Sequence, residues 1–376
     1  MSEVRKRYES LDFFRAIACL GVIAAHSCEI HFLKSSQLFL FTFWDKLVSA
    51  LVHFRAGVQI FFCISGYCIT YALLNKRAGF KGFFLNRLKR IFPPYWACFF
   101  IFAALTFFAK WFSKAIFNID SLFNTADPSV LDRSQWIGNL LLWETWRYHI
   151  FGSPKDLFLS HAWSLCYEEQ FYLFLGIFLF ISRRFFFQLM CWFSLVVFLG
   201  VFFQYQERVD FTGFGFDRYW IPFGFGILVF YYLHQATLTS RKVIFGLVAL
   251  VSMIAIFLHF TSWSANDIAE GVMRSVATAG TFSGLLFVLY SFDKRFVQLP
   301  VIRQLTFVGT FSYSLYLVHL PITFVLMRLC WNLGLRDGWQ AIWISTPLCI
   351  FVSFLAAWPF YLLFEKPFLS RSASKA

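Results

Sequence analysis

Two residues that can do chemistry lie inside the first long apolar run of the sequence. Arg15 and His26 both fall between Leu11 and Ile30, where a simple membrane anchor needs neither. Insertion scales put an arginine at a membrane helix centre at roughly 2.5 to 3.5 kcal/mol unfavourable, so such a residue is a candidate for function. Eleven helical residues turn through about 1100°, which places both side chains on one face, about 16 Å apart along the axis. The alternative is that Arg15 reaches the membrane surface while His26 only hydrogen-bonds another helix.

A pair of arginines precedes the third apolar run. Arg87 and Arg90 lie three residues apart in an inner loop that ends at Pro93 and Pro94, so they are neighbours on one helical face. Guanidinium groups bind phosphate through two parallel hydrogen bonds, which favours a cytoplasmic nucleotide or coenzyme A as the partner. Ordinary anchoring by positive residues on the cytoplasmic side explains the same pair.

Two further segments are unusually polar for stretches that enter lipid. His161, Ser164, Glu168 and Tyr172 fall on one stripe of the fourth apolar run, and Ser312, Tyr316 and His319 fall on one stripe of the ninth. Each stripe indicates either a reaction site or a network of hydrogen bonds between helices.

Ser65 is the one serine that resembles a nucleophile, but it lacks the Gly-x-Ser-x-Gly turn, so Ser65 and Gly66 favour close helix packing instead.

Composition places these residues in a membrane protein. The 376 residues are 59% hydrophobic and 22% aromatic, with only 14% charged. A net charge of +13 does not indicate nucleic acid, because no clustered basic face on a soluble domain is visible. The nine cysteines are an odd number and show no CxxC spacing, so neither a metal site nor a redox pair is expected.

The apolar runs predict an all-α polytopic membrane bundle. Ten runs are long enough to cross about 30 Å of hydrocarbon, near residues 11–31, 54–75, 91–109, 161–181, 185–204, 219–236, 243–261, 273–292, 306–329 and 341–364. Connections on the side of the N-terminus hold 19 of the 33 Lys and Arg residues but only five acidic ones. Because cytoplasmic connections are rich in Lys and Arg, both termini are expected in the cytoplasm.

The whole chain, residues 1–376, is expected to form one integral-membrane domain with no appended soluble domain. Its one long connection is an outer loop from about residue 110 to residue 160, too long for a simple connector. That loop is either a lid or acceptor-binding surface, or a loosely ordered segment without a role. Gly280 and Gly284 have the spacing of a helix-packing motif.

In their order along the chain, these segments resemble the acyltransferase-3 family of bacterial membrane proteins, and the resemblance covers nearly the whole chain. It rests on the segments Leu11 to Arg15 with His26, Phe61 to Tyr67, Arg87 to Tyr95, Trp163 to Leu165 with Glu168, and Ser312 to His319. Cys166 and Tyr167 depart from the more usual small and aliphatic pair before Glu168. The fused esterase-like domain of some family members is absent from this sequence.

The resemblance implies transfer of a small acyl group, usually acetyl, from cytoplasmic acyl-CoA to a hydroxyl of an extracytoplasmic carbohydrate or glycolipid. O-antigen (lipopolysaccharide), capsule and exopolysaccharide are all compatible acceptors, and the expected location is the bacterial inner membrane. No permanently bound cofactor is expected, since acetyl-CoA would be a substrate. By resemblance, Arg15, His26, Arg87 and Arg90 carry the functional roles.

A mechanism follows as a hypothesis. Arg87 and Arg90 would hold the phosphates of coenzyme A while its arm passes Arg15 and delivers the thioester near His26. In apolar surroundings the charged form of an imidazole is disfavoured, so His26 would be either the base for the acceptor hydroxyl or the nucleophile. Glu168 would orient His26 or the acceptor. Three further residues are candidates for acceptor binding or oxyanion stabilisation: Trp163, Tyr316 and His319.

The main rival is a transporter or flippase of a glycan or lipid-linked substrate, which also places ionisable residues in the membrane. The sequence shows no matching halves, which argues against that class. A structural membrane scaffold would tolerate alanine at both Arg15 and His26.

Overall fold

The computed structural model describes residues 8–38, 42–75, 79–117, 127–207, 212–261 and 267–369. Within these ranges the secondary structure is helical, and no strand is present. The chain divides into two compact units. The first comprises Met1–Ala18, Ala56–Phe84 and Leu165–Gly309, and the second comprises Cys19–Arg55, Leu85–Ser164 and Thr310–Ala376. Three boundaries fall within helices α1 (Leu11–Leu38), α4 (Gly79–Phe117) and α7 (Trp163–Ile181), one falls within the 3₁₀ turn His53–Ala56, and one falls between Gly309 and Thr310.

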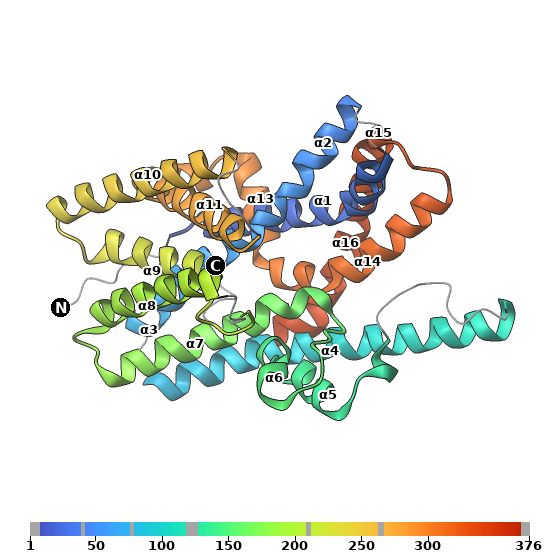
Figure 1. Ribbon diagram of the computed structural model, residues 1–376, viewed down its shortest axis with the longest axis horizontal. Helices are drawn as coiled ribbons and strands as arrows, with labels where there is room; N and C mark the ends of the chain where they lie inside the picture. The colour runs from blue at the N-terminus through green and yellow to red at the C-terminus, as the bar shows by residue number, and fades with distance from the viewer. Residues whose placement is uncertain are drawn as a thin grey trace. The chain divides into compact units, whose positions relative to one another are not determined.

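Each of the remaining helices, most of which are labelled in Figure 1, belongs to one unit, except that Thr310, the last residue of α13, is assigned to the second. The first unit adds α3 (Gly57–Asn75), α8 (Phe186–Glu207), α9 (Trp220–His234), α10 (Leu238–Phe260), α11 (Asp267–Leu289), α12 (Asp293–Val297) and α13 (Pro300–Thr310). The second adds α2 (Phe43–Val52), α5 (Arg133–Leu140), α6 (Glu144–Phe151), α14 (Ser312–Asn332), α15 (Gly338–Gln340) and α16 (Thr346–Phe360), with π-helical turns at Ala341–Ser345 and Tyr361–Glu365.

The prediction of a polytopic membrane helical bundle is confirmed. Eight helical segments of the described chain are long and apolar enough to cross a membrane: Leu11–Glu29, Phe43–Leu74, Gly82–Trp111, Ser160–Ile181, Leu238–His259, Glu270–Val297, Ser312–Asn332 and Gly338–Phe368. Two shorter apolar helices, Phe186–Val201 and Trp220–His234, lie where the fifth and sixth runs were predicted. The cytoplasmic position of both termini stays a prediction from the charge pattern.

Glycine allows α3 and α9 of the first unit to pack at backbone contact. A Cβ atom on Gly66 would lie 2.1 Å from the carbonyl oxygen of Phe223, and one on Gly226 would lie 1.9 Å from that of Cys63. The expectation that Gly66 serves close helix packing is therefore confirmed.

The predicted Gly280–Gly284 packing motif of α11 is in close contact at one of its two positions only. A Cβ on Gly280 would meet the hydroxyl of Ser252 on α10, whereas Gly284 faces open space.

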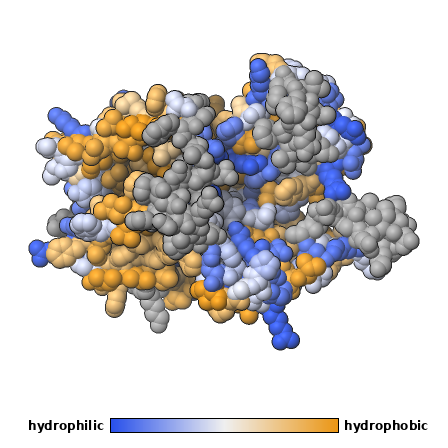
Figure 2. Space-filling model, in the orientation of Figure 1, coloured by the Kyte–Doolittle hydropathy of each residue, from blue (hydrophilic) through white to orange (hydrophobic). Residues whose placement is uncertain are grey.

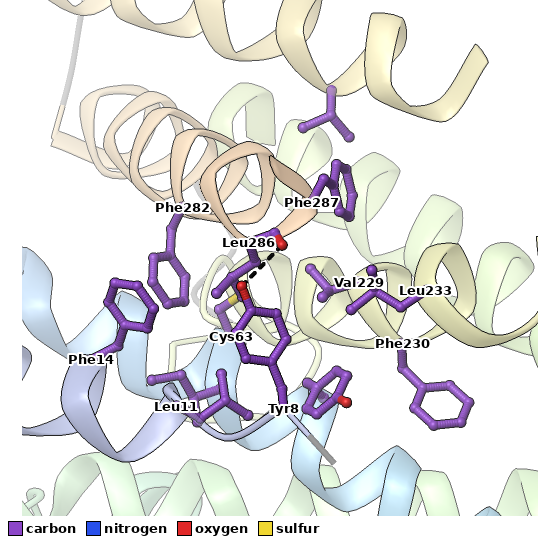
Figure 3. Close-up of a cluster of buried hydrophobic side chains, with 13 residues drawn as sticks. Tyr8, Leu11, Phe14, Cys63, Val229, Phe230, Leu233, Phe282, Leu286 and Phe287 are labelled. Atoms are coloured by element: carbon purple, nitrogen blue, oxygen red, sulfur yellow. Dashed lines mark hydrogen bonds between the residues drawn. The ribbon is translucent and has the colours of Figure 1, made fainter. Parts of the chain in front are cut away.

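The apolar core of the first unit joins α1, α3, α9, α10 and α11 (Figure 3). Tyr8 enters this core just before α1 and is fully buried. Its hydroxyl donates to the carbonyl of Leu286 over 3.1 Å, which is the dashed line in Figure 3. A buried hydroxyl needs such a partner, so this bond fixes where the chain enters α1.

A residue distant in the sequence holds the start of α1. The carboxylate of Asp293 accepts hydrogen bonds from the backbone N–H groups of Glu9, over 2.7 Å, and Ser10, over 3.0 Å. The first amides of a helix have no partner within it, and a negative charge there is favourable. Gly309 at the end of α13 approaches the same turn so closely that its Cβ would lie 1.7 Å from the carbonyl oxygen of Asp12.

In the second unit α14 packs against α16. Phe311, just before α14, contacts the rings of Phe354 and Trp358 on α16. The buried carboxylate of Glu365 accepts from the backbone N–H of Ser314 over 3.1 Å and from its hydroxyl over 2.5 Å. These contacts fix the start of α14, which carries Tyr316 and His319.

Two predictions about α4 and the following segment are wrong in detail. The inner loop expected before Pro93 and Pro94 is helical, because α4 runs continuously from Gly79 to Phe117. Membrane helices tolerate proline where neighbouring groups satisfy the freed backbone. The outer loop expected over residues 110–160 is also partly helical: α4 occupies its start, and α5 and α6 follow.

A buried ion pair stabilises this outer segment. The guanidinium of Arg147 donates to both carboxylate oxygens of Glu144, over 2.8 and 2.9 Å, and to the carbonyl of Gly152 over 2.8 Å. Both residues of the pair are at most 2% exposed. Tyr95 of α4 donates to the carbonyl of Asn139 in α5 over 2.7 Å. The segment is a folded part of the second unit, which excludes the loosely ordered alternative for the residues described.

The outward sides of the first unit's helices are apolar (Figure 2). In that view orange side chains cover much of the face over α7, α8 and α10. Large exposed apolar residues occur on α8 and α10, among them Trp192, Phe198, Leu250, Met253 and Phe257. Such surfaces favour contact with lipid hydrocarbon.

Candidate functional site

Arg15 lies in the first unit, one turn from the start of α1. Its guanidinium forms an ion pair with Asp12, one turn earlier on the same helix, and lies 3.3 Å from the thiol sulfur of Cys68 on α3. The Arg15 side chain is 18% exposed. Asp12 offsets the charge of the arginine within the apolar helix, which makes its position inside the first run tolerable.

Glu168 also lies in the first unit, on α7. The hydroxyl of Ser65 on α3 donates to one of its carboxylate oxygens, and the phenol of Tyr172, one turn along α7, donates to the other over 2.8 Å. Glu168 lies close enough to Arg15 for its negative charge to attract the guanidinium. Ser65, Glu168 and Tyr172 therefore form one hydrogen-bonded group, and Ser65 is a donor to a carboxylate within it.

His26 lies farther along α1, in the second unit, and it is oriented by a carboxylate. Its Nδ1 atom lies 3.2 Å from an oxygen of Glu29, the residue one turn later on the same helix. The other oxygen of Glu29 pairs with Arg55 over 2.9 Å. Because that guanidinium favours the ionised carboxylate, Glu29 accepts and His26 Nδ1 carries the proton. The lone pair of the neutral ring then sits on Nε2.

Two other histidines surround the same ring in the second unit. The ring centroid of His319 on α14 lies 5.8 Å from that of His26, and the centroid of His161, just before α7, lies 5.5 Å from that of His319. His161 is 6% exposed and His319 is 1% exposed. We refer to His26, His161 and His319 as the histidine cluster.

Hydrogen bonds fix the tautomer of His319. Its Nδ1 atom lies 2.6 Å from the carbonyl oxygen of Tyr316, one turn earlier on α14. A carbonyl oxygen only accepts, so Nδ1 carries the proton and Nε2 carries the lone pair. That Nε2 atom is buried and has no hydrogen-bond partner among the residues described. The neutral His319 ring therefore presents an acceptor to the cluster.

Tyr316 links the two polar stripes recognised in the sequence. Its hydroxyl donates to the backbone carbonyl of His161, and the ring of His161 stands edge-on to the Tyr316 ring with centroids 5.1 Å apart. The hydroxyl of Ser164 lies 2.9 Å from that of Tyr316. Since the Tyr316 proton is directed at the carbonyl, Ser164 is the donor in this second bond. Trp163, the first residue of α7, lies between His161 and Ser164 in the sequence and is half-buried.

Arg87 and Arg90 lie in the second unit, three residues apart on α4, and both are half-buried. Lys89 between them is exposed. The charge of Arg90 acts on the phenol of Tyr361 beyond α16. The helical spacing needed for two guanidinium groups to share one phosphate is therefore present.

The structure sorts the predicted residues into two sets. Arg15 and Glu168 belong to the first unit, and His26, Arg87, Arg90, Trp163, Tyr316 and His319 belong to the second. The carboxylate bonded to His26 is Glu29, whereas both oxygens of Glu168 are bound by Ser65 and Tyr172. Glu29 is not among the residues predicted from the sequence, although its position three residues after His26 places it on the same helical face.

Comparison with known proteins gives one family. Residues 8–362 match a family model described as an acyltransferase domain. The peptidoglycan O-acetyltransferase OatA of Listeria monocytogenes is 24% identical over 340 residues, covering 85% of this chain and 50% of that protein. A putative O-acetyltransferase of Staphylococcus aureus strain COL is 26% identical over 339 residues, covering 83% of this chain and 50% of that protein.

A putative peptidoglycan O-acetyltransferase of Bacillus subtilis, YrhL, is 29% identical over 177 residues, which cover 45% of this chain and 23% of that protein. The chain spans about half the length of the first two relatives. No solved structure matches it.

Proposed function

The chain belongs to the acyltransferase-3 family of membrane proteins, and we propose that it transfers an acetyl group from cytoplasmic acetyl-CoA to a hydroxyl of an extracytoplasmic carbohydrate. The observation that carries this proposal is the pairing of His26 with Glu29, which leaves the lone pair of a neutral imidazole on Nε2. A proton acceptor so oriented is what acyl transfer to a hydroxyl requires. Two of the three relatives named above carry peptidoglycan in their names, so peptidoglycan is the first acceptor to test, ahead of O-antigen, capsule and exopolysaccharide.

His26 acts as the general base in the proposed reaction. Its Nε2 atom takes the proton of the acceptor hydroxyl while the hydroxyl oxygen forms a bond to the thioester carbon, and the carbonyl electron pair moves onto oxygen. When the pair returns, the carbon–sulfur bond breaks and the thiolate of coenzyme A leaves with its electrons. The thiolate then receives the proton from His26, so the base is regenerated.

A second version of the reaction uses His26 as the nucleophile. Nε2 bonds to the thioester carbon, the carbon–sulfur bond breaks, and the thiolate leaves with its electrons. The acceptor oxygen later bonds to the acyl carbon, the carbon–nitrogen bond breaks with its electron pair returning to Nε2, and the hydroxyl proton passes through Nε2 to the thiolate of coenzyme A. Labelled acetyl-CoA given without acceptor separates the two versions, because only the second retains label on the protein. The orienting role of Glu29 is the same in both.

Arg87 and Arg90 bind the phosphates of coenzyme A at the cytoplasmic face in this proposal. Their spacing on α4 and the phosphate chemistry of guanidinium groups support the assignment. Arg15 contributes to donor binding, and its half-buried, charged side chain, 18% exposed and paired with Asp12, supports that role. The proposed location is the bacterial inner membrane, where a multi-pass protein can bind acetyl-CoA from the cytoplasm and the carbohydrate from the outer side.

The test uses inverted membrane vesicles from cells that express the full chain. Acetyl-CoA carrying radioactive acetate is added outside, which is the cytoplasmic side, and alkali-labile label in envelope polysaccharide is measured. Wild type should incorporate label, and His26→Ala should incorporate none while the protein stays in the membrane. His53→Ala is the matched control, because His53 is exposed and lies outside the histidine cluster. Equal labelling by His26→Ala and wild type would remove His26 from the reaction, and absence of labelling by wild type would overturn the proposed activity.

A further inference from the structure

The histidine cluster contains a hydrogen-bond donor that the reaction above leaves unassigned. Acyl transfer passes through a state in which the thioester oxygen carries negative charge, and a positioned N–H or O–H group lowers the energy of that state. The Nε2 atoms of His26 and His319 cannot be this donor, since each carries a lone pair in the neutral ring and only accepts hydrogen bonds. The donor must come from another group.

The hydroxyl groups beside the cluster are already used. The phenol proton of Tyr316 is directed at the backbone carbonyl of His161, and the hydroxyl proton of Ser164 is directed at the oxygen of Tyr316. Each hydroxyl has one proton to donate. Neither is available to a substrate oxygen without breaking a buried hydrogen bond.

His161 differs from both of these groups. Neither ring nitrogen of His161 makes a hydrogen bond of normal geometry to a described residue. The carbonyl of Leu317 lies close enough to act on the ring, but it already accepts from the thiol of Cys98 over 3.3 Å. A neutral imidazole carries one N–H whichever tautomer it adopts. Leaving such a buried donor without a partner costs about 1 to 3 kcal/mol, so a side chain of this kind requires an explanation.

The position of the ring supplies that explanation. The ring of His161 lies against that of His319, with centroids 5.5 Å apart, and His319 lies against His26. The backbone of His161 is fixed because its carbonyl accepts the Tyr316 hydroxyl. Burial of this ring beside two other imidazoles disfavours a positive charge on it. The neutral ring therefore offers one N–H, on a residue whose backbone is fixed beside His319.

We infer that His161 is the oxyanion donor: its ring N–H binds the carbonyl oxygen of the acyl group and stabilises the negative charge that develops there. This inference rests on the proposed function, since it gives His161 a part in the same acyl transfer. It replaces the expectation that Tyr316 or His319 stabilises the oxyanion. The Tyr316 hydroxyl already donates to the carbonyl of His161, and Nε2 of His319 only accepts.

Substitution distinguishes a donor from a packing residue. His161→Asn and His161→Gln retain a side-chain N–H near the position of one or the other ring nitrogen, whereas His161→Phe and His161→Met fill the space without a donor. We expect the apolar variants to lower kcat for labelling by about 100- to 1000-fold, the usual effect of removing one oxyanion donor, with KM for acetyl-CoA unchanged. At least one amide should be at least 10-fold faster than both apolar variants.

A spectroscopic measurement reports on the same bond without turnover. Acetyl-CoA labelled with carbon-13 at the carbonyl is bound to the purified full chain, and its carbonyl stretch is recorded by infrared difference spectroscopy. The wild-type protein should shift the stretch to lower frequency, and His161→Met should remove that shift while size-exclusion chromatography shows a folded protein.

The outcomes separate the two proposals. If wild type and His161→Met shift the carbonyl stretch equally, or if neither amide exceeds the apolar variants in rate, His161 is not the donor. If wild type incorporates no label into polysaccharide, the proposed function fails instead.

Discussion

The Nδ1 atom of His26 lies 3.2 Å from a carboxylate oxygen of Glu29, whose other oxygen pairs with Arg55. The three side chains form a chain of charge and hydrogen bonds that sets which ring nitrogen is basic. Glu29→Gln keeps the shape, but the amide N–H₂ can donate to Nδ1 and stabilise the wrong tautomer. We expect kcat for polysaccharide labelling to fall by about 100-fold or more. Glu29→Asp, which keeps the charge, should lose less, and equal activity of Glu29→Gln and wild type would contradict the orienting role.

Arg87 and Arg90 should be specific for the phosphates of the donor. Replacing either by glutamine is expected to raise KM for acetyl-CoA about 10-fold, which corresponds to about 1.4 kcal/mol, with little change in kcat. S-acetylpantetheine has no phosphate, so its reaction should be insensitive to both changes. Lys89→Gln is the control, because Lys89 is exposed on the same turn of α4. A similar loss with both donors would indicate a structural defect instead.

The ion pair between Arg147 and Glu144 should be essential for stability of the outer segment. A guanidinium is not deprotonated in proteins, so Arg147 stays charged when its partner is changed. Glu144→Gln leaves that charge buried, and we expect a loss of about 3 to 5 kcal/mol in the free energy of unfolding. The measurement is thermal unfolding in detergent, with exposed Arg133→Gln as a control expected within about 0.5 kcal/mol of wild type. An unchanged midpoint for Glu144→Gln would show that the pair contributes nothing.

Gly226 should tolerate no side chain. Gly226→Ala places a Cβ 1.9 Å from the carbonyl oxygen of Cys63 and 2.8 Å from the backbone nitrogen of Tyr67, so α9 must move away from α3. We expect a destabilisation of about 1 to 3 kcal/mol, measured as a lower midpoint of thermal unfolding. Gly284→Ala meets nothing within 4 Å and should cause no loss. Similar midpoints for the two variants would argue against backbone contact between α3 and α9.

Asp217, in the connection between α8 and α9, should make stability depend on pH. Burial raises the pKa of this carboxyl to about 6, above its value in the unfolded chain, although it accepts hydrogen bonds from Tyr167 and from the backbone N–H of Tyr219. Between pH 4 and pH 6 the folded state holds a proton that the unfolded state has released. The contribution of Asp217 to the free energy of unfolding therefore falls as pH rises through this range.

Asp217→Asn isolates that effect, because the amide does not titrate. The midpoint of thermal unfolding of the variant, relative to wild type, should be more favourable at pH 7.5 than at pH 4.5. The same difference between the two proteins at both pH values would rule out a buried titrating carboxylate at this position.

Local sequence patterns were sufficient to predict much of this structure. Apolar run length predicted the membrane segments, and helical spacing placed Tyr316 and His319 on one face, where both meet His161. The sequence pattern suggested Glu168 as a group that orients His26, whereas the carboxylate bonded to His26 is Glu29, three residues later on the same helix. The pattern also missed α5 and α6, because their stability comes from the buried pair of Glu144 and Arg147 and not from apolar periodicity.

The bonds from Asp293 to the amides of Glu9 and Ser10 carry a consequence for biogenesis. The two ends of the first of these bonds are 284 residues apart, and translation adds about 5 to 20 residues per second. The ribosome thus needs roughly 15 to 60 s to deliver the carboxylate that caps the first helix. Until then the segment that carries Arg15 lacks the hydrogen bonds from Asp293 that fix its start. The proposed catalytic centre can therefore be completed only late in synthesis.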